Sequence, residues 1–186
     1  MHFFTSFLLA GSLAALPSAG PAAPAFPAGF PVQMASAPQV STTATGLLSP
    51  ADLERLLPAT VFFSGQSAPL QLRNSAGFRN AAGRMVWAGL VDTSGYSTGV
   101  REKYQFYFVT ELPLTVGTLT VQPGIYGGGF LSDNNFVLLD VAGNEIGRTA
   151  VTEDKELRRP RPLQMTAEGS GFRLYLGRQY ATLSPR

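Results

Sequence analysis

Three arginines that lie close together are the residues with the clearest chemical potential in this sequence. Arg158, Arg159 and Arg161 follow a short acidic run at residues 153–156 and stand among two prolines. Guanidinium groups bind carboxylate, phosphate or sulfate at two points, and the prolines limit the backbone entropy lost on binding. The sequence therefore predicts an exposed connection over residues 152–162, in which these three arginines are the candidate anion-binding residues and a solvated loop without a binding role is the alternative. Without a binding role, the three arginines would be expected to pair locally with the neighbouring acids.

Aromatic side chains offer a second kind of binding chemistry. Trp87 and Tyr126 belong to a set of tryptophan and tyrosine residues that is large enough to stack on a sugar or to line an apolar cavity. We take both as candidate ligand-binding residues. Core packing explains the same residues equally well, so this alternative stays open.

The residues that most enzymes need are missing from the sequence. Cysteine is absent, and the only histidine, His2, lies in a segment that we expect to be removed. Serine–histidine and cysteine–histidine catalysis are therefore excluded, together with the usual zinc, copper and haem ligand sets. We predict no catalytic residue, no metal site and no cofactor, and we favour a protein that is not an enzyme.

Carboxylates are the remaining catalytic possibility. The acids near predicted strands are Asp92, Glu111, Asp140 and Glu145, and nothing in their spacing places two of them around a sugar. They are typical of turns and strand edges. A carboxylate-dependent hydrolase acting on glycans is kept as an alternative.

Two further polar or glycine-rich motifs have structural explanations. Residues 133–135, Asp-Asn-Asn, lack the length and the closing acid of a calcium loop, so we expect an Asx-type turn. The triple glycine at residues 127–129 lacks the lysine of a phosphate loop. It indicates a bulge or a close approach of an aromatic ring or another backbone.

Short β-prone runs separated by turn residues position these side chains. Residues 113–130 hold three such runs, with Gly117 and the Pro123-Gly124 pair as turns, and Gly124 is expected to take a positive φ. Residues 84–91 read as a strand that is buried on both faces. Nine or ten strands predict an all-β fold, either a single β-sandwich or a small barrel of short antiparallel strands.

One short N-terminal helix completes the predicted domain. Ser49 is suited to cap it, Pro50 suits its first turn and Pro58 ends it. The alternative, an α+β domain, needs a second helix, for which residues 152–159 are the only candidate.

The first 46 residues differ in composition from the rest of the chain. Residues 1–22 are apolar and then small, which predicts a signal peptide cleaved after about residue 22 to 25, although it has no Lys or Arg. Residues 23–46 are rich in Pro and Ala and predict a disordered linker. The β domain is expected over residues 47–186, without a membrane-spanning segment after signal removal.

Composition and charge narrow the function further. Only 14% of residues are charged and the formal net charge is +2, which does not indicate a nucleic-acid partner. We expect an exported protein, periplasmic, surface-associated or secreted, that binds an unknown envelope component or partner protein through its turns. A purely structural envelope protein is a second alternative.

A resemblance rests on residues 83–96 (GRMVWAGLVDTSGY), residues 113–130 and the closing run at residues 173–178 (RLYLGR). In these segments the chain resembles a group of small exported bacterial proteins of unknown function. The resemblance implies an exported β domain over residues 47–183, and it brings no activity or site residues.

Overall fold

The computed structural model describes residues 46–186. The first strand begins at Gly46, one residue before the predicted start of the domain. The predicted signal peptide, residues 1–22, lies outside the described residues, and so does the predicted linker up to residue 45.

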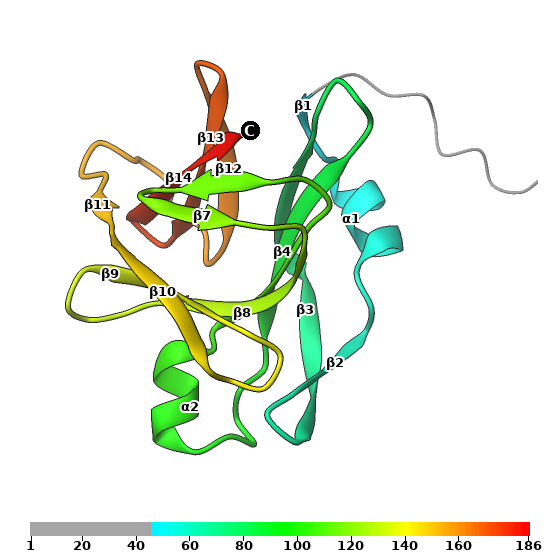
Figure 1. The fold of residues 1–186 in the computed structure, drawn as a ribbon, viewed down its shortest axis with the longest axis vertical. Coiled ribbons are helices and arrows are strands. Elements are labelled where there is room, and N and C mark those ends of the chain that lie inside the picture. Colours follow the sequence, from blue (N-terminus) through cyan, green and yellow to red (C-terminus); the bar gives the residue numbers. More distant parts are fainter. Residues whose placement is uncertain (1–45) are drawn as a thin grey trace, which may run out of the picture. The chain divides into compact units, whose positions relative to one another are not determined.

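The described chain folds into two antiparallel sheets (Figure 1). The first sheet has the order β1-β3-β4-β5-β8-β9-β10, and β2 pairs with β3. Its strands are β1 (Gly46–Leu47), β2 (Thr60–Phe63), β3 (Gln66–Arg79), β4 (Met85–Val91), β5 (Phe106–Thr110), β8 (Gly124–Phe130), β9 (Asn135–Leu139) and β10 (Glu145–Ala150).

The second sheet has the order β12-β13-β14-β6-β7, and β11 pairs with β14. Its strands are β6 (Leu114–Val116), β7 (Leu119–Val121), β11 (Thr152–Glu153), β12 (Gln164–Glu168), β13 (Gly171–Leu176) and β14 (Gln179–Pro185). The two sheets pack face to face, so the all-β prediction is confirmed and the architecture is that of a sandwich.

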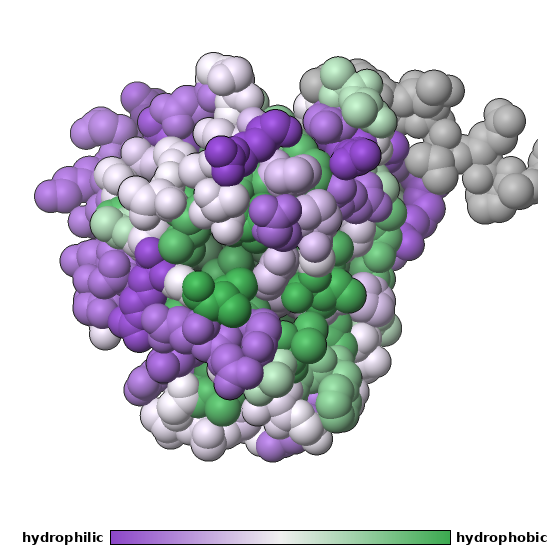
Figure 2. Space-filling view, viewed as in Figure 1, coloured by the Kyte–Doolittle hydropathy of each residue, from purple (hydrophilic) through white to green (hydrophobic). Residues whose placement is uncertain are grey.

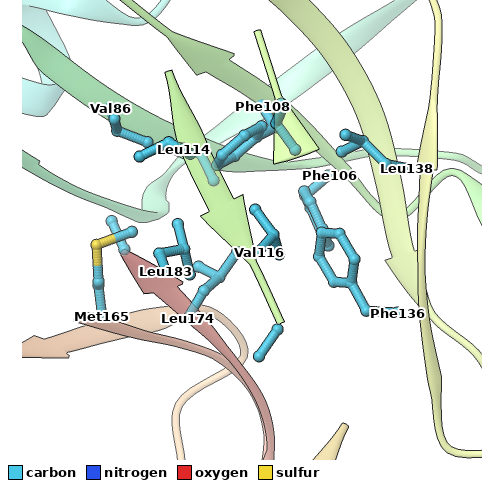
Figure 3. Packing of buried hydrophobic residues seen from close by; sticks show 14 of the residues in the cluster. Val86, Phe106, Phe108, Leu114, Val116, Phe136, Leu138, Met165, Leu174 and Leu183 are labelled. Carbon is cyan, nitrogen blue, oxygen red and sulfur yellow. The ribbon is translucent and has the colours of Figure 1, made fainter. Parts of the chain in front are cut away.

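The main core lies between the sheets, as Figure 3 shows. Alternation along β5 directs Phe106 and Phe108 inward, and both are fully buried. They meet Leu114 from β6 and Leu174 from β13. The short apolar runs of the sequence thus become strands because each buries every second residue in one shared layer.

A second apolar cluster covers the outer face of the first sheet. Helix α1 (Pro50–Leu56) contributes Leu53, and Leu57 follows at the cap. Trp87 and Val91 of β4 belong to this cluster, whereas Val86 and Ala88 belong to the main core. The prediction that residues 84–91 are buried on both faces is therefore confirmed.

The helix prediction is confirmed at α1 and incomplete elsewhere. Ser49 caps α1, with its hydroxyl oxygen accepting from the backbone N–H of Asp52 at 3.2 Å. A second short helix, α2 (Thr98–Lys103), was not predicted, because its Thr-Gly-Val start has a low helix propensity. Residues 152–159 hold β11 and turns, so the proposed second helix in that segment is wrong.

The segment 113–130 forms its three predicted strands, but not a simple meander. Gly117 turns β6 into β7 at a φ of 55°. Gly124 does not take the positive φ that we expected, because it is the first residue of β8 and pairs with Thr110 of β5. Residues 122 and 123 therefore carry the chain from the second sheet to the first.

The triple glycine is explained by close approach. A Cβ atom on Gly127 would lie 2.7 Å from the Tyr104 ring, and one on Gly129 would lie 2.6 Å from the Lys103 carbonyl oxygen. One on Gly128 would lie 2.8 Å from the Phe106 ring. These three positions of β8 must therefore lack side chains for their neighbours to pack against the strand.

Candidate functional site

The three predicted arginines lie in the connection between β11 and β12, which we call the arginine loop (residues 154–162). Arg158, Arg159 and Arg161 are all exposed. Among residues 46–186, no ion pair is formed by any of the three. Figure 2 shows the hydrophilic surface on the left of the view, where β11 and this loop lie.

The backbone of the arginine loop is held by Arg178, which lies in the turn between β13 and β14. Its Nη1 atom donates to the carbonyl oxygens of Asp154, Lys155 and Leu157 at 3.4, 3.1 and 2.7 Å. The backbone N–H of Asp154 also donates to the Arg178 carbonyl oxygen at 2.9 Å. The loop is therefore fixed at several points although it lies at the surface.

The acids beside the arginines do not neutralise them. Asp154 accepts a hydrogen bond from the Tyr175 hydroxyl at 3.0 Å and lies 4.0 Å from Arg173. Glu153 and Glu156 are exposed, and no ion pair of theirs occurs in the described part of the chain. The local pairing expected of a loop without a binding role is not seen.

Arg173 holds this end of the second sheet together. Its guanidinium lies over the Tyr180 ring, 4.4 Å from the centroid, and pairs with Glu168. The pairing raises the pKa of Arg173 further above its usual range, with the Glu168 hydrogen bonds as the largest cause. This arginine is thus committed to the fold, unlike those of the loop.

The two aromatic candidates are not brought together. Trp87 is half-buried in the outer cluster of the first sheet, and its indole N–H is buried without a hydrogen-bond partner in the described structure. Tyr126 packs against the main core, and its hydroxyl donates to the Gln122 carbonyl oxygen at 2.8 Å. The two side chains lie on opposite faces of the first sheet.

A groove beside the arginine loop was not predicted. Its volume is about 490 Å³, and it is lined by the start of α1, by part of β3 and by residues 161–165. Here β3 bulges, since Gln71 pairs with Leu90 and Ser75 pairs with Gly89. Bulges re-aim side chains, and this one carries Leu72, Arg73 and Asn74 into the lining of the groove.

A second hollow, of about 530 Å³, is lined by α2 residues and by the turn before β9. The cations beside it, Lys103 and Arg148, are paired with acids, whereas the exposed Glu102 in its lining forms no ion pair among residues 46–186. Lys103 lies 3.6 Å from Glu145, and Arg148 pairs with both Glu145 and Asp133. These contacts hold the pKa of Glu145 below its usual range, with the Arg148 hydrogen bond as the largest cause. In the described part of the chain, the lining of this hollow offers no unpaired cation to a ligand.

The four carboxylates considered for hydrolysis stabilise turns and strand ends. The Ser94 backbone N–H lowers the pKa of Asp92, and hydrogen bonds from Asn144 lower the pKa of Asp140. Glu111 accepts from the backbone N–H of Met85 at 2.7 Å. A general acid needs a raised pKa, so this arrangement gives the hydrolase alternative no support.

The predicted Asx-type turn at residues 133–135 is confirmed. The Asp133 carboxylate accepts from the backbone N–H of Asn135 at 3.2 Å. Within residues 46–186, no group of three acidic or histidine side chains is placed to hold a metal ion.

Sequence reasoning missed Arg178 and Arg73. Neither has a local signal, because Arg178 acts on carbonyl groups more than twenty residues away in the chain. The role of Arg73 depends on a bulge that only the pairing of β3 with β4 defines. The polarity of residues 74–83 could have indicated an interrupted strand, but not where its side chains point.

No helix in the described part of the chain is long and apolar enough to span a membrane. Comparison with protein-family models, with curated proteins and with solved structures finds no match to this chain, so its resemblance to small exported bacterial proteins stays a prediction.

Proposed function

We propose that the protein is an exported, non-enzymatic β-domain protein that binds an anionic envelope component or partner protein through the arginine loop. One observation supports the proposal most. Arg158, Arg159 and Arg161 are exposed and free of ion pairs among the described residues, while the backbone that carries them is fixed.

The fixed backbone of the arginine loop reduces the conformational entropy that is lost when an anion binds. A flexible loop loses conformational entropy when it closes on a ligand, and a loop that is already fixed loses less. Arg178 and the prolines at residues 160 and 162 supply that restraint. The acids at residues 153, 154 and 156 leave the arginines unpaired, so a ligand need not displace an internal partner.

The two alternative functions, glycan hydrolase and structural envelope protein, require different features of the surface. A glycan hydrolase needs a carboxyl group whose pKa is raised, and the pKa values of Asp92, Asp140 and Glu145 are lowered. A purely structural envelope protein needs no free cationic surface. The unpaired loop arginines favour the binding function over both.

The test is retention of the full-length chain on a sulfated resin such as heparin. We expect retention to be lost when Arg158, Arg159 and Arg161 are all replaced by alanine, with little change in stability, because surface charges contribute at most about 1 kcal/mol. Unchanged retention would contradict the proposal.

A matched control replaces three exposed arginines elsewhere, Arg55, Arg84 and Arg101, by alanine. This variant loses the same formal charge but keeps the arginine loop. It is expected to be retained like the wild type. Equal loss of retention in both variants would mean that overall charge, not the loop, binds the resin.

A further inference from the structure

The groove beside the arginine loop combines an aliphatic floor with two exposed guanidinium groups at its rim and one buried amide donor in its lining. Its apolar lining comes from both clusters of the domain: Leu53 of α1 belongs to the outer cluster, and Leu163 and Met165 belong to the main core. Leu48 and Leu72 add half-buried surface. Small-molecule sites have volumes of roughly 300–1,000 Å³, and the groove, at about 490 Å³, lies within that range.

The donors come from three different segments. Arg73 is carried by the bulge of β3, Arg161 by the arginine loop and Gln164 by β12. The Gln164 Nε2 atom is buried and has no hydrogen-bond partner in the described structure. A buried donor without a partner is unfavourable, and an acceptor supplied by a ligand would remove that cost.

The balance of charge favours an anion. Arg73 and Arg161 are exposed and unpaired within residues 46–186, and Glu54 is the one acid that lines the groove. The nearby Asn74 side chain is already engaged, since its amide donates to Gln71 at 2.8 Å.

The lining also indicates which anion fits. Among residues 46–186, no aromatic residue lines the groove, so the described lining lacks the flat rings that stack on sugars and on aromatic ligands. Leucine and methionine side chains instead adapt to a flexible aliphatic chain. A ligand with one acidic group and one alkyl chain matches both halves of the site.

We propose that this groove binds a monomeric fatty-acid-like carboxylate, with the alkyl chain on the floor formed by Leu53, Leu163 and Met165 and the carboxylate at Arg73, Arg161 and Gln164. The inference rests on the proposed anion-binding function and extends it, because Arg161 belongs both to the loop and to the groove. The envelope component would then be an acyl anion, not a sugar.

Calorimetric titration of the full-length chain with hexanoate, octanoate and decanoate, each below its micelle concentration, tests the floor. Affinity is expected to rise about fourfold for each added methylene that fits, as the free energy of methylene burial requires. Decanol, which has the chain without the charge, is expected to bind at least tenfold more weakly than decanoate, because hydrogen bonds to charged groups are the strong ones. Equal binding of hexanoate and decanoate would overturn the proposal.

Arg73→Gln tests the rim, because Arg73 lies outside the arginine loop. It is expected to weaken decanoate binding about fivefold or more and to leave decanol unchanged, whereas Arg84→Gln, at an exposed arginine outside the groove, changes neither. Leu72→Asn is expected to weaken both ligands.

The outcomes separate the two proposals. Resin retention that depends on the arginine loop, combined with no binding of decanoate, would refute the groove and leave the loop function standing. Binding to vesicles of anionic phospholipid without binding of monomeric decanoate would also refute the groove, because the ligand would then be a membrane surface.

Discussion

Two buried tyrosines of the outer cluster differ in whether the hydroxyl group forms a hydrogen bond, and a pair of substitutions can measure the effect of that difference on stability. Tyr104 is fully buried, and its hydroxyl has no hydrogen-bond partner in the described structure. Tyr96 is also buried, but its hydroxyl donates to the carbonyl oxygens of Phe63 and Gln66, each at 3.1 Å. Replacing each by phenylalanine removes one oxygen atom and leaves the ring.

The expected effects have opposite signs. A buried polar group without a partner costs about 1–3 kcal/mol, so Tyr104→Phe should raise the free energy of unfolding by about 1 kcal/mol or more. The ring keeps its stacking on Phe63, at a centroid distance of 3.6 Å. Tyr96→Phe loses a satisfied hydrogen bond and should lower the free energy of unfolding by about 1 kcal/mol.

Urea unfolding of the full-length chain measures both effects. With an m value of about 1–3 kcal/mol/M, the two midpoints should move apart by roughly 1 M. The wild type should lie between them. A lower midpoint for Tyr104→Phe, or equal shifts for the two variants, would refute the claim that the Tyr104 hydroxyl is unsatisfied.

Three further predictions follow from the packing. Gly128→Ala should lower the free energy of unfolding, measured in urea, by about 2 kcal/mol or more, since its Cβ would lie 2.8 Å from the Phe106 ring and 2.9 Å from the Val137 carbonyl oxygen; a neutral effect would contradict the packing. Arg178→Ala should accelerate amide hydrogen exchange in the arginine loop and leave the core strands unchanged; unchanged loop exchange would mean that other contacts fix it. Burial raises the pKa of Tyr104, which favours the neutral phenol in the folded state. The contribution of this neutral phenol to the free energy of unfolding is therefore complete below about pH 10, which is the pKa of tyrosine in the unfolded chain. It is lost as the pH rises above that value. The fall in alkaline urea midpoints should be shallower in Tyr104→Phe, and an identical fall would contradict the assignment.

Local patterns were enough to find most strands. The β-prone run at residues 84–91 predicted β4 to within one residue of its observed start, and Gly117 forms its predicted turn at a positive φ. These features depend on neighbours in the sequence, since alternation and turn chemistry are local properties. The short β-prone runs therefore became strands largely where the sequence predicted them.

Features that depend on long-range pairing could not be predicted. Gly124 looked like a turn residue, but pairing with Thr110 makes it the start of β8. The polar stretch from residue 74 continues β3 to Arg79, because β1 and β4 pair with it on either side. Tertiary pairing overrides the weak preference of such residues for loops.

The candidate site likewise has some features that local sequence predicted and others that depend on distant segments. The composition of residues 152–162 identified three exposed arginines, which the structure confirms as exposed. One of the neighbouring acids, Asp154, is engaged by Tyr175 and Arg173 of β13, and no local pattern indicated this contact. The anchoring by Arg178 and the groove lining from Arg73 likewise come from distant segments, so no local pattern indicated them.

The most direct test of the proposed function is to map where an anion binds on the full-length chain. Nuclear magnetic resonance titration with a sulfated oligosaccharide would report each backbone amide separately. The proposal predicts that the largest shift changes fall in residues 155–161 and at Arg178, and that they disappear when Arg158, Arg159 and Arg161 are replaced by alanine. Largest changes around Lys103 and Arg148, or changes that persist in the triple variant, would contradict it.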